Sequence, residues 1–302
     1  MELEPNAGGR RGLRDVRIKD ERLARVLAGE ERLLFDGAMG TMLQRAGLVV
    51  GEQPEMLCVE NPDAITAIHR AYVNAGSQAI TTNTFGANRE KLGDVATVEA
   101  VFCAAVKCAR DAGACYVAAD MGPTGELMEP LGDMTYEQAY ELYAEQARAA
   151  DAAGADLIII ETMTSIDELK AAVCAAQDHS ELPVFATMTF AANGHTFMGA
   201  TPSDEIELLQ ELEIDALGIN CSLGPKELEP LVREMLENAT VPVIMQANAG
   251  LPKMVGGETV YTITPEEYAA AVAPLIEAGV KIVGGCCGTD PTFIEALAAV
   301  MR

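Results

Sequence analysis

The sequence predicts an α/β fold, a (β/α)8 TIM barrel with an N-terminal extension, and three observations support this class. Eight short apolar runs recur along the chain, and each ends in polar residues or glycine before a longer helix-like segment. Successive runs start roughly 25 to 45 residues apart, which is the length of one βα unit. The first run is not followed by G-x-G-x-x-G, the phosphate-binding turn that an open doubly wound sheet usually carries there.

The eight runs are the predicted strands, because each is short, apolar and bounded by turn residues. Hydrophobic residues make up 49% of the 302 residues, which is enough for the core of one large barrel. In chain order the runs read RLLFDGAMG, SQAITTNTFG, CYVAADMGP, ADLIIIETM, PVFATMTF, ALGINCS, PVIMQANAG and KIVGGCCG.

Capping signals mark several of the helices between the runs. Acidic residues near the start of a helix and glycine at its end agree with the preferences of helix caps and with the helix dipole. The helices that show this pattern most clearly are expected to begin at Asn61, Thr135, Ser203, Thr264 and Asp290.

The N-terminal extension covers residues 1–30, and the barrel is expected to cover residues 31–302. Residues 1–12 contain Pro5 and several small residues, which predicts disorder. The segment from Asp20 to Leu27 has the composition of a short helix, which would close the bottom of the barrel.

Composition limits the class of partner. The formal net charge is −25, and so acidic a chain repels the phosphate backbone of nucleic acids. No apolar run approaches the roughly 18 to 20 residues that a membrane span needs. The charged N-terminus lacks the apolar stretch of a signal peptide. We therefore expect a cytoplasmic protein that binds neither nucleic acid nor membrane.

Polar residues gather where the predicted strands end. Barrel enzymes place their chemistry at the carboxyl ends of the strands, so these side chains should share one opening. They comprise two aspartates, a glutamate, a threonine, several amides and three thiols. In chain order they are Asp36, Thr82, Asn83, Asp120, Glu161, Asn220, Cys221, Asn248, Cys286 and Cys287.

The cysteines give the sharpest signal at this opening. Cys221 ends the sixth run, and the pair Cys286 and Cys287 ends the eighth. Neighbouring residues of a regular strand point to opposite faces, but Gly284, Gly285 and Gly288 allow the chain to bend around the pair. Three convergent thiolates suit tetrahedral zinc with one open position. A redox dithiol and plain buried cysteines are the alternatives, although no C-x-x-C motif supports the first.

The other five cysteines are expected to be buried or incidental thiols, with Cys58 and Cys115 in or beside loops. A zinc ion held by three thiolates carries a net charge of about −1, which makes it a weak Lewis acid. It can accept a substrate thiol as a fourth ligand and keep it as a nucleophilic thiolate. This ligand set therefore favours alkyl transfer to sulfur.

Five segments together resemble the homocysteine S-methyltransferase family, and most of all the N-terminal homocysteine-binding module of cobalamin-dependent methionine synthase. They are FDGAMGTMLQ, HRAYVNAGSQAITTNTFGAN, GINCS, QANAGLP and GGCCGTDP, and the likeness runs from about residue 32 to the end. The resemblance implies zinc-dependent methyl transfer to homocysteine, giving methionine, with Cys221, Cys286 and Cys287 as the metal ligands. It also implies that Asp36, Gly37 and Glu161 bind homocysteine, and that Asn248 touches the substrate or the metal.

The sequence says less about the identity of the methyl donor than about that of the methyl acceptor. A complete cobalamin-dependent enzyme also has folate-binding and corrinoid-binding modules, and 302 residues leave no room for them. The resemblance therefore implies methylcobalamin carried by a separate module or protein, and Gly288 stands where relatives that use S-methylmethionine often have arginine. Direct use of S-methylmethionine, S-adenosylmethionine or betaine is the alternative, as is a thiol-acceptor subunit of a corrinoid demethylation system. Aromatic residues suited to a cationic donor are few, with Phe85, Phe190 and Phe197 near the expected opening.

Overall fold

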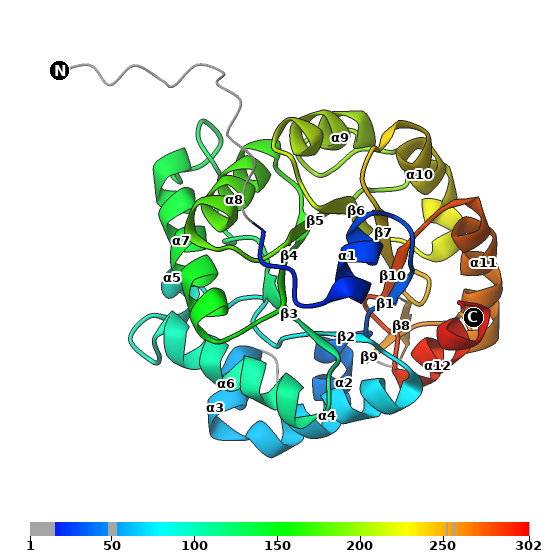
Figure 1. The fold of residues 1–302 in the computed structure, drawn as a ribbon, viewed down its shortest axis with the longest axis horizontal. Coiled ribbons are helices and arrows are strands. Elements are labelled where there is room, and N and C mark those ends of the chain that lie inside the picture. Colours follow the sequence, from blue (N-terminus) through cyan, green and yellow to red (C-terminus); the bar gives the residue numbers. More distant parts are fainter. Residues whose placement is uncertain (1–15, 48–52, 252, 256–257, 302) are drawn as a thin grey trace.

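The computed structural model describes residues 16–47, 53–251, 253–255 and 258–301. Eight parallel strands form a nearly closed barrel inside a ring of helices, which confirms the predicted fold (Figure 1). Around the barrel the strand order is β1-β10-β7-β6-β5-β4-β3-β2. The strands are β1 (Leu33–Leu34), β2 (Ala79–Thr81), β3 (Tyr116–Met121), β4 (Leu157–Met163), β5 (Val184–Met188), β6 (Ala216–Asn220), β7 (Val243–Ala247) and β10 (Ile282–Gly285).

Gln78 forms two of the hydrogen bonds that cross the gap between β1 and β2. The backbone N–H of Gln78 donates to the carbonyl of Leu34 at 2.8 Å, and the Gln78 side-chain oxygen accepts from the N–H of Leu34 at 3.1 Å. These two bonds satisfy strand groups that would otherwise face each other unpaired. They bring the ends of β1 and β2 to the same opening.

Each strand is followed by at least one helix that covers the outside of the barrel. The longer helices are α4 (Pro62–Ala75), α6 (Val98–Asp111), α7 (Tyr136–Ala152), α8 (Ile166–His179), α9 (Pro202–Glu211), α10 (Pro225–Asn238), α11 (Pro265–Ala278) and α12 (Pro291–Val300). The short elements are α1 (Glu21–Leu27), α2 (Met39–Arg45), the 3-10 helix η1 (Pro54–Met56), α3 (Leu57–Glu60), α5 (Arg89–Leu92) and the antiparallel pair β8 (Lys253–Val255) and β9 (Glu258–Val260). Among the described residues, no helix combines the length and apolar character that a membrane crossing requires.

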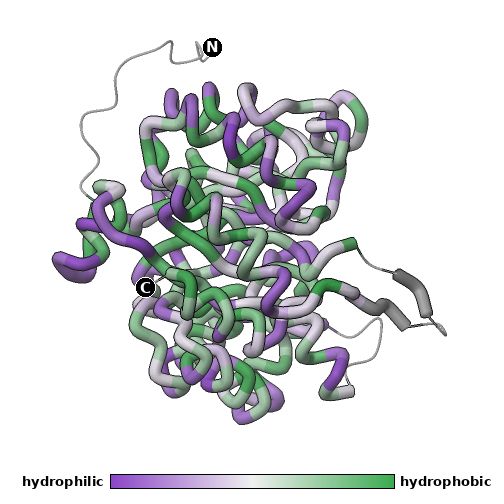
Figure 2. The backbone as a smooth tube through the Cα atoms, turned by 90° about the vertical axis from the view of Figure 1, so that its right-hand side faces the viewer, coloured by the Kyte–Doolittle hydropathy of each residue, from purple (hydrophilic) through white to green (hydrophobic). Residues whose placement is uncertain are grey.

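The core has two layers because strand side chains alternate. In β4, Leu157 and Ile159 point into the barrel, whereas Ile158 and Ile160 pack against the surrounding helices. This double burial explains the continuous apolar run that predicted the strand. In Figure 2 the centre of the molecule is mostly hydrophobic, and the strongly hydrophilic stretches lie at the outside.

The helix starts expected from the caps are confirmed at four of the five positions. Asn61, Thr135, Thr264 and Asp290 are the residues that precede α4, α7, α11 and α12. The prediction for Ser203 is wrong, because α9 starts at Pro202. Thr201 accepts from the N–H of Asp204 and forms a capping box with it, and proline favours the first helical position. Cys58 also lies in α3 rather than in a loop.

Helix α1 closes the bottom of the barrel, as the sequence suggested. Leu23 and Val26 are fully buried and belong to the same cluster as the inward-facing strand residues. The disorder expected for residues 1–12 falls outside the described residues. The division into an extension of residues 1–30 and a barrel of residues 31–302 stays a prediction.

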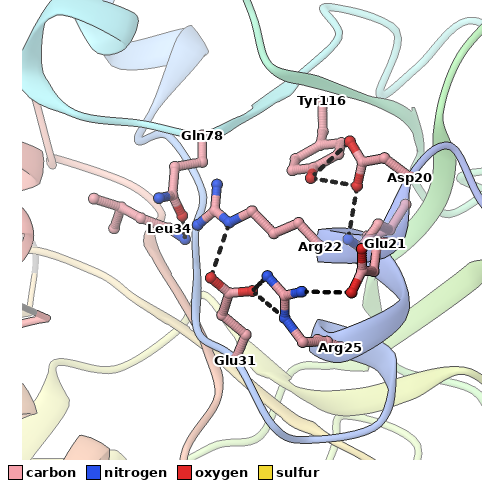
Figure 3. A network of polar contacts seen from close by, with 9 residues as sticks. Asp20, Glu21, Arg22, Arg25, Glu31, Leu34, Gln78 and Tyr116 are labelled. Carbon is pink, nitrogen blue, oxygen red and sulfur yellow. Dashed lines mark hydrogen bonds and ion pairs between the residues drawn. The ribbon is translucent and has the colours of Figure 1, made fainter.

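Asp20 anchors α1 to the barrel (Figure 3). Its Oδ1 accepts from the N–H of Leu23 at 2.8 Å and from the Tyr116 hydroxyl at 2.9 Å. We expect Asp20→Ala to lower the free energy of unfolding by about 1 kcal/mol at neutral pH, because an unpaired helix N–H remains. Urea denaturation measures this effect.

Acid should reduce the effect of Asp20→Ala. The backbone N–H of Leu23 lowers the pKa of Asp20, which opposes the effect of burial. A carboxylate whose pKa is depressed on folding contributes stability above its unfolded pKa, and loses it as the pH falls through the folded pKa. The difference between wild type and variant should therefore shrink below pH 4 (about the unfolded pKa of aspartate). Glu30→Ala is the control, because it removes a nearby exposed carboxylate that caps no helix, and an equal loss there would contradict the assignment.

Candidate metal and substrate site

A cavity of about 280 Å³ opens at the carboxyl ends of the strands. Most of the polar residues expected at the strand ends line it, whereas Asn220 and Asn248 are not among the lining residues. Among the described residues, the lining includes four carboxylates and three thiols but no lysine, arginine or histidine. The carboxylates and thiols are those of Asp36, Glu55, Asp120, Glu161, Cys221, Cys286 and Cys287.

The three predicted metal ligands converge at one side of this cavity. The Sγ atoms of Cys221, Cys286 and Cys287 all lie within 4.8 Å of one another, and those of Cys221 and Cys287 are 3.8 Å apart. Tetrahedral zinc with sulfur at about 2.3 Å would set its sulfur atoms about 3.8 Å apart. The donor set therefore fits zinc in both chemistry and spacing.

The end of β7 holds both cysteine segments in place. The N–H of Cys221 donates to the carbonyl of Gln246 at 3.0 Å, and the N–H of Cys286 donates to the carbonyl of Ala247 at 2.8 Å. Cys221 has a φ of 62°, a left-handed conformation that is costly for a residue with a side chain. Such strain often marks functional positions, where the surrounding structure imposes it.

The glycines around the cysteine pair allow the turn that directs both sulfurs to the same place. A Cβ on Gly285 would lie 2.2 Å from Oγ1 of Thr289. That hydroxyl donates to the carbonyl of Cys286 at 2.6 Å, so the chain folds back directly after β10. Gly288 has a φ of 84°, which continues the turn.

The pKa values of the three thiols differ from one another. Hydrogen bonds from Cys286, and then from Cys287, lower the pKa of Cys221 to about 3. The same contact with Cys221 raises the pKa of Cys286, and raises that of Cys287 to about 11. A thiolate at Cys221 supplies the first anionic ligand that a metal cation requires.

Burial raises the pKa of three carboxylates in the cavity, those of Asp36, Asp120 and Glu161. Desolvation raises the pKa of Asp36 to about 7, although hydrogen bonds from Thr81 oppose this shift. Desolvation also raises the pKa of Glu161 to about 8, and the negative charges of Cys221 and Asp36 add to it. Burial, and then the negative charge of Glu161, raise the pKa of Asp120 well above its ordinary value. The cavity is therefore suited to a ligand that brings positive charge.

Asn220 fixes the position of Glu161. Its Nδ2 donates to Oε2 of Glu161 at 3.3 Å and to Oγ1 of Thr162 at 2.8 Å, while its Oδ1 accepts from the N–H of Thr162 at 2.9 Å. Thr162 has a φ of 62°, and the pairing of β4 with β5 shifts register in this region. The buried amide thus stabilises an irregular strand end that directs Glu161 into the cavity.

Comparison with known proteins identifies this arrangement. The family model of homocysteine S-methyltransferase matches residues 33–301. The chain belongs to the homocysteine S-methyltransferase family. It is 34% identical to methionine synthase from Mycobacterium tuberculosis (strain ATCC 25618 / H37Rv), over 95% of this chain and 26% of that protein. Methionine synthase from Mycobacterium leprae (strain TN) is also 34% identical, over 89% of this chain and 24% of that protein. The chain thus spans about a quarter of the length of these relatives.

Solved structures agree with this membership. The homocysteine methyltransferase MmuM from Escherichia coli, in its oxidized form, superposes with a TM-score of 0.77 at 25% identity, covering 93% of this chain and 99% of that one. Its metallated form gives the same TM-score and identity, covering 92% of this chain and 99% of that one. The carboxyl transferase domain of Rhizobium etli pyruvate carboxylase has a TM-score of 0.53 at 13% identity, which shows a shared fold alone.

Gly37 and Asn248, which the resemblance to the family also implied as site residues, lie in different surroundings. Gly37 lines the cavity, and a Cβ there would lie 2.8 Å from the carbonyl oxygen of Thr289, so the close approach requires glycine. Asn248 is only 4% exposed, and its Oδ1 has no hydrogen-bond partner among the residues that the structure describes. Its side chain hydrogen-bonds Cys221 and lowers the pKa of that thiol, so it contacts the cysteine cluster rather than the cavity.

The three aromatic residues considered near the opening lie in different places. Phe85 lines the cavity, and its ring would contact a Cβ on Gly122 at 2.6 Å, so this glycine leaves room for it. Phe190 is fully buried in the outer core, and Phe197 is 85% exposed and is not among the cavity-lining residues. Sequence reasoning also missed Glu55, whose loop gives no strand-end signal, and the positioning role of Asn220.

Proposed function

We propose that the chain transfers a methyl group to the thiol of homocysteine to give methionine, with zinc held by Cys221, Cys286 and Cys287. The observation that carries this proposal is the convergence of three thiols, within 4.8 Å of one another, beside an acidic cavity. A zinc ion bound there would hold the substrate sulfur as a thiolate that remains nucleophilic. Family membership supports the choice of homocysteine as acceptor.

The residues of the cavity would orient the rest of the substrate. Homocysteine carries an ammonium group a few bonds from its sulfur, and the carboxylates of Glu161 and Asp36 can accept its hydrogen bonds. Asp36 is buried and Glu161 is half-buried, and the partial exclusion of water strengthens such an ion pair. The backbone of Gly37 lines the same wall, where no side chain obstructs the substrate. Asn248 would hold Cys221 in its ligating position.

The immediate methyl donor is proposed to be methylcobalamin on a separate corrinoid-binding module or protein, which a folate-binding module would recharge. The relatives of about four times this length are named methionine synthases, and this chain matches only about a quarter of each. A donor carried by another module requires an accessible thiolate, and the cavity opens at the barrel end where the cysteines lie. Among the described residues, only Phe85 supplies an aromatic ring to that cavity.

A direct-donor methyltransferase is the second candidate. The chain covers 99% of the Escherichia coli homocysteine methyltransferase structure, so a chain of this size is named as a methyltransferase on its own. The cavity is acidic and contains no basic side chain among its lining residues, which also suits a sulfonium or trimethylammonium donor. S-methylmethionine, S-adenosylmethionine and betaine belong to this class.

A methyl-transfer assay on the zinc-loaded chain separates the two candidates. We expect methionine to form slowly from homocysteine and free methylcobalamin, faster with a methylated corrinoid protein, and not at all with methyltetrahydrofolate alone. Turnover with S-methylmethionine and none with methylcobalamin would support the direct-donor candidate instead. Methionine formation is measured by mass spectrometry, and the chain without homocysteine is the blank.

A further inference from the structure

Asp120 is a buried carboxylate at the end of β3 that lines the cavity and is only 4% exposed. Its Oδ1 is buried and has no hydrogen-bond partner in the described part of the chain. A buried polar acceptor that stays unpaired costs free energy in a folded protein, so an orphan of this kind calls for an explanation. An absent ligand that donates a hydrogen bond into the cavity would supply one.

The backbone on either side of this carboxylate is held firmly. The N–H of Asp120 donates to Oγ1 of Thr82 at 3.0 Å, and its carbonyl accepts from Oγ1 of Thr84 at 2.8 Å. The two threonine hydroxyls are 2.7 Å apart and both residues are buried. This network fixes the place of Asp120 before any ligand arrives, which reduces the entropic cost of binding.

The neighbouring carboxylates are already partly engaged. Asp36 accepts from the N–H of Thr81 through Oδ2 at 3.0 Å, and from the Thr81 hydroxyl through Oδ1 at 2.8 Å. Glu161 accepts from Asn220 at 3.3 Å. Glu55 accepts from the N–H of Gly86 at 2.7 Å. Asp120 also has a backbone hydrogen bond, from Met121, but among the described residues its Oδ1 has no partner.

We propose that Asp120 is a specificity-determining residue that accepts a hydrogen bond from the ammonium group of an α-amino thiol. This inference rests on the proposed function and assigns the recognition of the amino group to a residue on β3, in addition to Glu161 on β4. A substrate with an ammonium group satisfies the orphan oxygen and adds positive charge among the carboxylates. A thiol without that group leaves the oxygen unpaired and binds more weakly.

Equilibrium binding of two thiols to the zinc-loaded protein tests the assignment. Homocysteine and 4-mercaptobutyrate share a sulfur, a carboxylate and a three-carbon spacing, and differ in the amino group. Asp120→Asn keeps the shape and removes the charge, so we expect homocysteine to bind about 10 times more weakly. The affinity for 4-mercaptobutyrate should change less than about twofold.

Two further variants strengthen the comparison. Asp120→Ser removes the carboxylate with a smaller side chain and should give the same selective loss. Asp133→Asn makes the same charge change at an exposed position of the β3–α7 connection that does not line the cavity, and it should leave both affinities unaltered. Zinc content and the melting temperature are measured for every protein.

The possible results are distinct. A selective loss for homocysteine in Asp120→Asn and Asp120→Ser supports the inference. Equal losses for both thiols, or no loss for either, would overturn it and leave the proposed function standing, because the wild type would still bind homocysteine through sulfur. If the zinc-loaded wild type bound neither thiol, the proposed function itself would be wrong and the inference would fall with it.

Discussion

Replacing Cys286 by serine is expected to remove zinc from the protein and to lower methyl transfer to homocysteine by at least about 1,000-fold, equivalent to about 4 kcal/mol. Cys286 is half-buried, and its sulfur lies within 4.8 Å of those of Cys221 and Cys287. A serine hydroxyl does not ionise near neutral pH and is a poor zinc ligand, so two thiolates would remain. Metal analysis after dialysis and the methionine assay measure the two effects.

The fold should survive the loss of this ligand. The strands and helices enclose two apolar clusters that do not include the three predicted metal ligands, and a core of this size does not need a structural metal. Circular dichroism and thermal melting should therefore match the wild type closely. Cys103→Ser is the matched control, because Cys103 is exposed on α6, and it should retain both zinc and activity. A zinc-free variant that is unfolded would reassign the metal to a structural role, and a variant that keeps zinc and activity would remove Cys286 from the ligand set.

The strands could be predicted because their physical signal is local. A strand that is buried on both faces must be apolar along its length. The run Leu157–Ile160 shows this pattern, since all four of its residues are apolar and buried. The ends of parallel strands meet at one opening, so residues far apart in the chain, such as Asp36 and Cys221, could be placed together without coordinates. The antiparallel pair β8 and β9 was not predicted, because strands of three residues give no periodic pattern.

The finer features of the site depend on tertiary contacts that cannot be predicted from the sequence. Ser203 and Thr201 are both acceptable caps, and the choice depends on Pro202 occupying the first helical position. Asn220 could be predicted as a polar residue at the end of β6. The hydrogen bonds from Asn220 to Glu161 and Thr162, however, depend on the register shift of β4. The orphan oxygen of Asp120 could be recognised only after every neighbouring donor had been placed.

Glu161→Gln is expected to weaken the binding of homocysteine by about 10 to 100 times, because a charge-assisted hydrogen bond to the ammonium group is lost. Burial, and then the charges of Cys221 and Asp36, raise the pKa of Glu161 to about 8 in the free protein. An ammonium group beside the carboxylate favours its ionised form and so offsets these effects. Glutamine keeps the size of the side chain and can still contact Asn220, which limits structural change. Calorimetry with homocysteine on the zinc-loaded variant measures the loss.

The controls distinguish substrate recognition from support of the barrel. Zinc content should stay unchanged, and 4-mercaptobutyrate, which lacks the amino group, should bind the variant and the wild type almost equally. Glu211→Gln removes an exposed carboxylate at the end of α9 and should affect neither thiol. If Glu161→Gln weakened both thiols to the same extent, the carboxylate would be holding the irregular end of β4 through Asn220. Its contribution would then be to position the strand end, and the ammonium group would need another partner.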